Sequence, residues 1–214
     1  MAERLASGNA AIALLANSLA TGGGLVALIL TFGPISGAHM NPSVTLADAA
    51  MGGVARRDVL PYIVAQIAGA YLGVAMAHGM FELPVFSASN HIRAGAAQFL
   101  SEFVASFGLL ATIWGVAKRR AGAMPFAVAA YIVAAYWFTA STSFANPAVT
   151  LARTGSNTFA GIRPGDAPAF IIAQLLGASA ATLLFRWLVP ALPQVAPDIM
   201  VPHPAAAVTT ESAP

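Results

Sequence analysis

A 14-residue motif occurs twice in the chain, each time between two long apolar stretches. The first copy is SGAHMNPSVTLADA at residues 36–49, and the second is STSFANPAVTLART at residues 141–154. Six of the eight residues that begin at the Asn are identical, and the copies are 105 residues apart. A second match, between residues 62–69 and 170–177, has an offset of 108 residues. The chain therefore consists of two related halves, each with the order apolar span, motif, apolar span.

Five stretches are apolar over the 20 or so residues that a helix needs to cross a bilayer. They are residues 10–32, 59–80, 95–117, 121–140 and 168–189. Only 8% of the residues are charged, against about 25% in soluble domains. The sequence therefore predicts an all-α integral membrane protein. It excludes a soluble enzyme and a disordered chain, and the net charge of +2 gives no basic surface for nucleic acid.

Each motif is predicted to form a short helix that starts at its Asn-Pro pair, because Asn suits the N-cap and Pro suits the first helical position. About eight residues follow, or about 12 Å, which is less than half of a bilayer. Two such half-helices entering from opposite faces meet at the midplane, where irregular backbone requires protein or water around it. A simple turn is the alternative for one Asn-Pro pair, but two pairs in matching positions favour a water-filled path.

The residues predicted at the midplane of this path can bind a neutral solute. Half-helix N-termini carry partial positive charge, which repels cations, while Asn amides donate hydrogen bonds. The predicted midplane residues are Asn41, Pro42, Ser43, Asn146, Pro147 and Ala148. The chain has no Cys, its four His are scattered, and no nucleophile–base pair or phosphate-binding loop is recognisable. We therefore expect no catalytic residues, no metal and no cofactor.

On these residues the chain resembles the aquaporin (major intrinsic protein) family, over about residues 10–190. That family carries two Asn-Pro-Ala boxes on the half-helices of an inverted repeat. Residues 39–45 match the first box with Ser43 in place of Ala, and residues 146–148 match the second. The resemblance implies an aquaporin-like helical bundle with six spans, a passive channel and a homotetramer with one pore per subunit.

The resemblance also assigns roles to single polar residues. Glu102 matches a Glu that accepts backbone N–H bonds from the re-entrant loop, a role we favour over a pore-lining carboxylate. Gln66 and Gln174 match buried Gln residues, for which ordinary helix–helix hydrogen bonding is as good an interpretation as a pore role. His39 is expected to line the cytoplasmic vestibule.

The predicted selectivity filter is unusual for the family, in which an Arg usually follows the second box. That position is Val149 here, and counting back from each Asn gives the other filter positions, Thr21, Ala134 and Ser143. All four are small and uncharged, so the resemblance implies a wide filter without a fixed positive charge. Arg153 lies one turn beyond Val149 and is expected at the outer vestibule, although a solvated helix end is the simpler interpretation.

The number of spans departs from the family pattern. Glu102 lies 44 residues before Asn146, whereas only 40 residues precede Asn41, so the first span of the first repeat is missing from the sequence. We expect that the coding region begins upstream of Met1 or that the chain is a true five-span form. Residues 1–190 are predicted to form one channel domain with repeats at 1–80 and 95–190, followed by a flexible tail at 191–214.

The sequence also predicts how the chain is oriented in the membrane and which solutes it transports. Arginines and lysines are densest in the loops on the same side of the membrane as the C-terminus, so we expect this side to face the cytoplasm. The protein is expected in the inner or plasma membrane of the cell. Residues 134–153 resemble bacterial aquaporins linked to arsenic resistance. The predicted function is a passive channel for water, glycerol-sized polyols and neutral metalloid acids such as arsenous acid. The alternative is a non-conducting or degenerate membrane protein.

Overall fold

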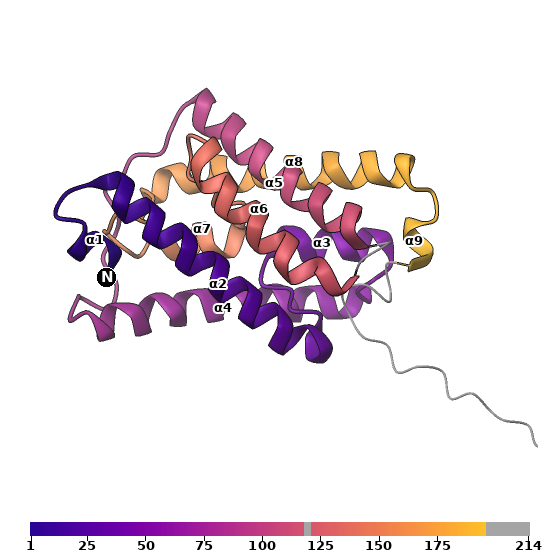
Figure 1. Cartoon of the computed structure of the whole chain (residues 1–214), viewed down its shortest axis with the longest axis horizontal. Coiled ribbons are helices and arrows are strands. Elements are labelled where there is room, and N and C mark those ends of the chain that lie inside the picture. Colours follow the sequence, from indigo (N-terminus) through magenta and orange to yellow (C-terminus); the bar gives the residue numbers. More distant parts are fainter. Residues whose placement is uncertain (118–120, 196–214) are drawn as a thin grey trace, which may run out of the picture.

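The computed structural model of this protein describes residues 1–117 and 121–195, and within them it contains helices and no strand (Figure 1). The elements are α1 (Ala2–Leu5), α2 (Ala10–Ser36), α3 (Pro42–Met51), α4 (Arg56–Met80), α5 (Ala96–Ala117), η1 (Ala121–Ala123), α6 (Met124–Phe138), α7 (Pro147–Arg153), η2 (Pro164–Asp166), α8 (Ala167–Leu188) and α9 (Leu192–Val195). The elements η1 and η2 are short 3-10 helices. The predicted all-α fold is confirmed.

The five predicted spans correspond to α2, α4, α5, α6 and α8. Four of them are long and apolar enough to cross a bilayer, whereas α6 has only 15 residues. The prediction of a helix over 121–140 is too long, because η1 occupies its first residues and Pro125 stands in the first turn of α6. At the other end, the extended backbone of Thr139 ends α6.

Local sequence sets the ends of α2. The side chain of Asn9 caps the helix by accepting hydrogen bonds from the N–H groups of Ala11 and Ile12, at 3.0 and 3.2 Å. The helix continues four residues beyond the predicted end at residue 32, since Pro34 is accommodated in its last turns. It ends where Gly37 adopts a left-handed φ of 73°, a conformation that glycine takes without steric cost.

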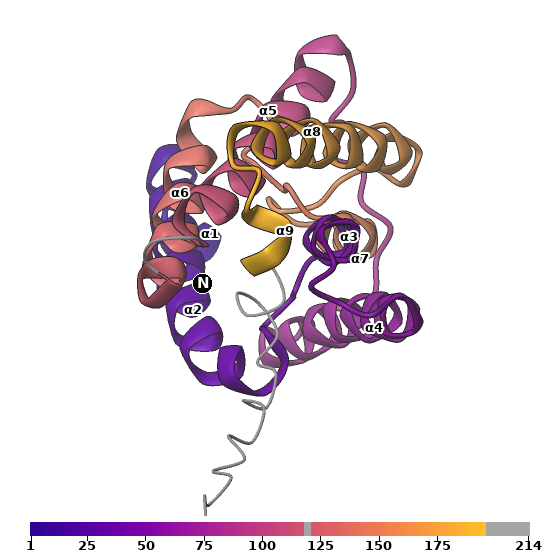
Figure 2. The same ribbon diagram turned by 90° about the vertical axis from the view of Figure 1, so that its right-hand side faces the viewer.

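The two half-helices lie in line, between α4 below and α8 above, and α2 and α6 face them from the left (Figure 2). Helix α2 packs along α6, α5 packs along α8, and α4 contacts both α3 and α7. The repeat relates α2 to α6, α3 to α7 and α4 to α8. Among the described residues α5 has no counterpart in the first half, so the two halves are enclosed unequally.

Close helix packing stabilises the α5–α8 pair. Gly177 lies so near α5 that an added Cβ would stand 2.2 Å from the backbone oxygen of Phe103. Trp114 is 1% exposed and donates its indole N–H to Thr182 Oγ1 at 3.2 Å. Small residues at such contacts let membrane helices approach closely.

The outer surface is apolar where a bilayer would lie. Helix α4 exposes Leu60, Val64, Leu72 and Met76, whose spacing places them on one side of the helix.

The flexible tail predicted at 191–214 starts too early in the chain. Residues 192–195 form α9, and Leu192 is fully buried in the core. Residues 196–214 and the basic cluster at 118–120 lie outside the described residues.

Candidate pore

The repeated Asn-Pro pairs start the two half-helices. Asn41 caps α3 by accepting a hydrogen bond from Ser43 N at 2.9 Å, and Asn146 caps α7 by accepting from Ala148 N at 3.0 Å. Each Pro follows its Asn as the first residue of the helix. The two caps have extended backbone, with φ of −151° and −154°. The local chemistry predicted for the motif is therefore present in both copies.

Each Asn also connects its half-helix to the opposite half of the protein. Asn41 Nδ2 donates to Ala145 O at 2.7 Å, and Asn146 Nδ2 donates to Met40 O at 2.8 Å. These reciprocal bonds fix the two N-terminal ends against each other. Since an amide nitrogen has two hydrogens, each Nδ2 keeps one hydrogen for another acceptor.

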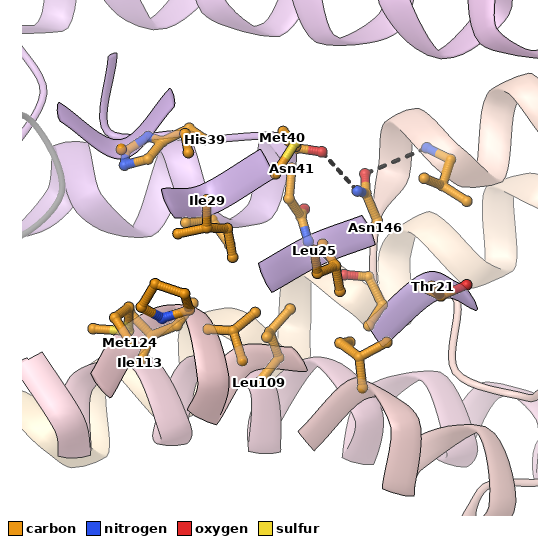
Figure 3. Close-up of a pocket in the computed structure, with 18 of the residues that line it drawn as sticks. Thr21, Leu25, Ile29, His39, Met40, Asn41, Leu109, Ile113, Met124 and Asn146 are labelled. Atoms are coloured by element: carbon orange, nitrogen blue, oxygen red, sulfur yellow. Dashed lines mark hydrogen bonds between the residues drawn. The ribbon is translucent and has the colours of Figure 1, made fainter. Parts of the chain in front are cut away.

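A cavity of about 540 Å³ runs beside this junction (Figure 3). One wall is apolar and is formed by successive turns of α2 and α6 together with α5. Its main residues are Leu25, Ile29, Leu109, Ile113, Val128 and Ile132. The opposite wall is formed by the half-helices and the loops before them, and it carries Asn41 and Asn146. From Thr21 to Pro34, α2 follows the cavity for about 20 Å, about two thirds of the roughly 30 Å hydrocarbon layer.

Of the predicted midplane residues, only the two asparagines line the cavity. The other four are buried in the first turns of the half-helices behind it; they are Pro42, Ser43, Pro147 and Ala148. Ser43 faces a smaller hollow of about 330 Å³ between α3 and α8. The four buried residues therefore shape the junction and do not touch a solute in the cavity.

Three of the four predicted filter residues line the cavity: Thr21, Ser143 and Val149. Ala134 does not; it is exposed on the opposite side of α6. Two residues along a helix correspond to a rotation of about 200°, so the count back from Asn146 selects the wrong face. Tyr136 lines the cavity instead, and its hydroxyl lies 3.3 Å from Thr21 Oγ1.

Glu102 holds the loop that leads into α7. Its carboxylate is fully buried and accepts hydrogen bonds from Phe144 N and Ala145 N, both at 2.9 Å. Gln174 Nε2 donates to the same carboxylate at 2.6 Å. Ser143 and Ala145 have φ of 49° and 48°, a left-handed conformation that non-glycine residues adopt only when the surroundings enforce it. The carboxylate thus stabilises a strained segment of the pore wall.

The glutamines make matching bonds in the two halves. Gln174 Nε2 also donates to Thr150 Oγ1 at 2.8 Å, and Gln66 Nε2 donates to Thr45 Oγ1 at the same distance. Gln66 Nε2 donates in addition to His39 O, at 2.5 Å. Neither Gln lines the cavity. Their contacts are those of helix–loop packing, in agreement with the simpler of the two interpretations.

The two ends of the cavity differ in charge. At one end His39 lines the cavity, and its Nε2 lies 3.8 Å from Asp48 Oδ2, with both side chains buried. At the other end Arg153 lines the cavity, and its guanidinium lies 4.3 Å from the ring centre of Phe144. These are the two residues predicted for the vestibules.

Arg93 is a structural residue at the second end that sequence reasoning missed. It is 8% exposed and donates to the carbonyl oxygens of Gly161, at 2.9 Å, and Ser141, also at 2.9 Å. Burial, followed by the nearby charge of Arg153, lowers the pKa of Arg93 to about 10, so it stays charged at neutral pH. Nothing in its local sequence signals this role, whereas Tyr136 could have been found from its helical spacing to Ile132.

Comparison with known proteins agrees with this geometry. The pattern of the family described as Major intrinsic protein matches residues 2–137 and 119–213. Aquaglyceroporin AqpS of Rhizobium meliloti is 54% identical over 92% of this chain and 86% of its own length. Aquaporin Z of Bradyrhizobium diazoefficiens is 32% identical over 83% of this chain and 80% of its own. A glycerol uptake facilitator protein of Streptococcus pneumoniae is 35% identical over 52% of this chain and 55% of its own. The chain therefore belongs to the major intrinsic protein family, whose members are multi-pass membrane channels and not enzymes.

Proposed function

We propose that this protein is a passive channel for small neutral solutes: water, glycerol-sized polyols and neutral metalloid acids such as arsenous acid. The observation that carries the proposal is the cavity with one apolar wall and one polar row. A polyol or a trihydroxy acid has a similar division between its apolar centre and its hydroxyl groups. The free amide hydrogens of Asn41 and Asn146 would donate to those hydroxyl oxygens.

Width and charge at the Val149 level favour solutes larger than water. Val149 offers neither a charge nor a side-chain hydrogen-bond donor. Thr21 and Ser143, which also line the cavity, are small, whereas Tyr136 is bulky. Arsenous acid is uncharged at neutral pH and close to glycerol in size, so it would not need to be desolvated as an ion. The names of the relatives from Rhizobium and Streptococcus point to glycerol-type cargo in those proteins.

The setting of the channel is part of the proposal. We place it in the cell membrane with the His39 end and the C-terminus in the cytoplasm, so that Arg153 faces outward. The exposed apolar side of α4 then contacts lipid or a neighbouring subunit of a homotetramer. Transport by this route follows the gradient and requires no cofactor.

Solute flux in proteoliposomes tests the proposal directly. Stopped-flow swelling would measure water, glycerol and erythritol entry, and arsenic analysis of washed vesicles would measure arsenous acid. We expect glycerol and arsenous acid to enter well above the rate of protein-free vesicles. Rates equal to those of protein-free vesicles would overturn the proposal and favour a non-conducting membrane protein.

Substitution of Val149 tests whether this residue sets the width of the selectivity filter. Val149→Arg adds length and charge and should reduce glycerol and arsenous acid flux much more than water flux. Val149→Met is the control without charge, because it also replaces Val by a longer, unbranched side chain. Equal loss of all solutes in Val149→Arg would show that residue 149 does not act as the filter.

A further inference from the structure

Arg153 shares the pore-facing side of α7 with two other cavity residues. Asn146, Val149 and Arg153 are spaced by three and four residues, which places them on one side of the half-helix. All three line the cavity. Arg153 is the last residue of α7, so its side chain lies one turn beyond Val149 in the direction of the cavity mouth.

The guanidinium of Arg153 is held across the cavity by residues from other elements. It stacks on Phe144 at 4.3 Å, a cation–π contact. One of its nitrogens, Nη2, donates to the hydroxyl of Tyr136 at 3.4 Å, and that hydroxyl in turn lies 3.3 Å from Thr21 Oγ1. Residues of α7, α6 and α2 therefore meet here around the cavity.

Arg153 keeps hydrogen-bond donors that its neighbour Arg93 has already used. Arg93 also lies against Phe144, at 4.8 Å, but its nitrogens donate to backbone oxygens of the surrounding loops. Among the described residues the guanidinium of Arg153 makes only the hydrogen bond to Tyr136. Ser143 also lines the cavity, but its Oγ is buried behind the cavity surface. The unused donors of the Arg153 guanidinium are therefore the ones that a solute in the cavity can reach.

We propose that Arg153 is the specificity-determining cation of this pore, positioned by Phe144, Tyr136 and Thr21 one helical turn beyond the uncharged Val149 level. Its fixed charge opposes the entry of cations, and its free N–H groups bind the hydroxyl oxygens of a neutral solute. The inference rests on the proposed channel function. It assigns the exclusion of cations to Arg153 and the limit on solute size to Val149, so substitutions at the two positions should change different properties.

Arg153→Met removes the charge and keeps an unbranched, flexible side chain. Purified protein in vesicles would be assayed for Na⁺ entry with an internal fluorescent indicator and for glycerol and erythritol entry by swelling. Because a charge in a low-dielectric cleft changes local ion concentrations by 10-fold or more, we expect Na⁺ entry to rise by about tenfold or more. The erythritol-to-water ratio should also change.

Arg4→Met is the matched control. Arg4 lies 5.0 Å from the ring centre of Phe81 at the same end of the molecule, but it is exposed and does not line the cavity. Arg4→Met therefore removes the same charge and the same type of ring contact, but from a position outside the pore. Because exposed charges are screened by salt, we expect Na⁺ entry to change by less than about twofold.

Further variants separate a filter role from a structural one. Arg153→Lys keeps the charge and should keep Na⁺ out while changing polyol ratios. The double variant Val149→Arg with Arg153→Met moves the charge inward, so it should restore Na⁺ exclusion and reduce glycerol flux. Tyr136→Phe removes only the hydroxyl that holds the guanidinium, so it should alter polyol ratios with Na⁺ still excluded. This conservative variant keeps the test usable if Arg153→Met does not fold.

The outcomes distinguish this inference from the channel proposal itself. If the wild-type protein conducts glycerol while Arg153→Met matches Arg4→Met in Na⁺ entry and polyol ratios, the assignment of Arg153 is overturned and the channel proposal stands. Failure of the double variant to restore Na⁺ exclusion would also overturn it. A wild-type protein without solute flux would overturn both.

Discussion

Glu102→Gln should destabilise the protein strongly, although the two side chains have nearly the same shape. The carboxylate is fully buried and accepts three hydrogen bonds, from Phe144 N, Ala145 N and Gln174 Nε2. A glutamine amide supplies one acceptor oxygen and places an NH₂ group where the second oxygen was. At least one of the three donors is then left buried without a partner.

The magnitude follows from these bonds. An unsatisfied buried donor costs about 1–3 kcal/mol, and each remaining bond loses about 1 kcal/mol when its acceptor becomes neutral. The free energy of unfolding should therefore fall by about 3–5 kcal/mol, a large part of the 5–15 kcal/mol typical of a folded protein. The left-handed residues of the loop would also lose the group that holds them, so solute flux should fall with stability.

Unfolding in mild detergent measures this change. SDS titration would be followed by far-ultraviolet circular dichroism and by tryptophan fluorescence, to which the buried Trp114 contributes. Glu82→Gln is the control, because Glu82 is exposed in the loop after α4. If Glu102→Gln unfolded at the same SDS fraction as Glu82→Gln, the carboxylate would not be the group that holds the loop.

Three other changes have definite expectations. Gly177→Ala places a Cβ 2.2 Å from a backbone oxygen of α5 and should cost about 1–3 kcal/mol, whereas Gly73→Ala, with no atom near its added Cβ, should be neutral in the same unfolding assay. Asn41→Asp keeps the capping oxygen but turns the donor to Ala145 O into an acceptor, so swelling assays should show less glycerol flux although α3 still forms. Arg93→Met removes three donors to backbone oxygens, and limited proteolysis should then cleave the 81–95 loop faster.

The half-helices were predictable from sequence because their chemistry is local. An Asn cap, a Pro at the first helical position and a break some eight residues later do not depend on distant contacts. The start of α2 after Asn9 is local in the same way, whereas its end at Gly37 lies beyond the predicted residue 32. Repetition of the motif also indicated that both copies have the same environment.

The pore wall was less predictable because it depends on how helices rotate against each other. Counting residues from Asn146 fixes the height of a residue in α6 but not the direction of its side chain, which explains the choice of Ala134 over Tyr136. Arg93 lies in a loop, and its partners are backbone oxygens from two other loops. Such partners are invisible to any motif. Leu192 is similar, since only the packed core shows that the chain turns back to bury it.

The two halves share their scaffold and differ where a solute enters. The half-helix caps and the glutamine bonds occur in both repeats with nearly equal distances. His39 and Asp48 are the repeat counterparts of Phe144 and Arg153. Arg153 lines the cavity, whereas Asp48 is buried behind His39. In each half a ring from the loop contacts a charged residue in the last turns of the half-helix, but the charge is negative in one half and positive in the other. The fold thus requires the repeat to be kept at the junction and leaves these two positions free to give the ends of one pore different chemistry.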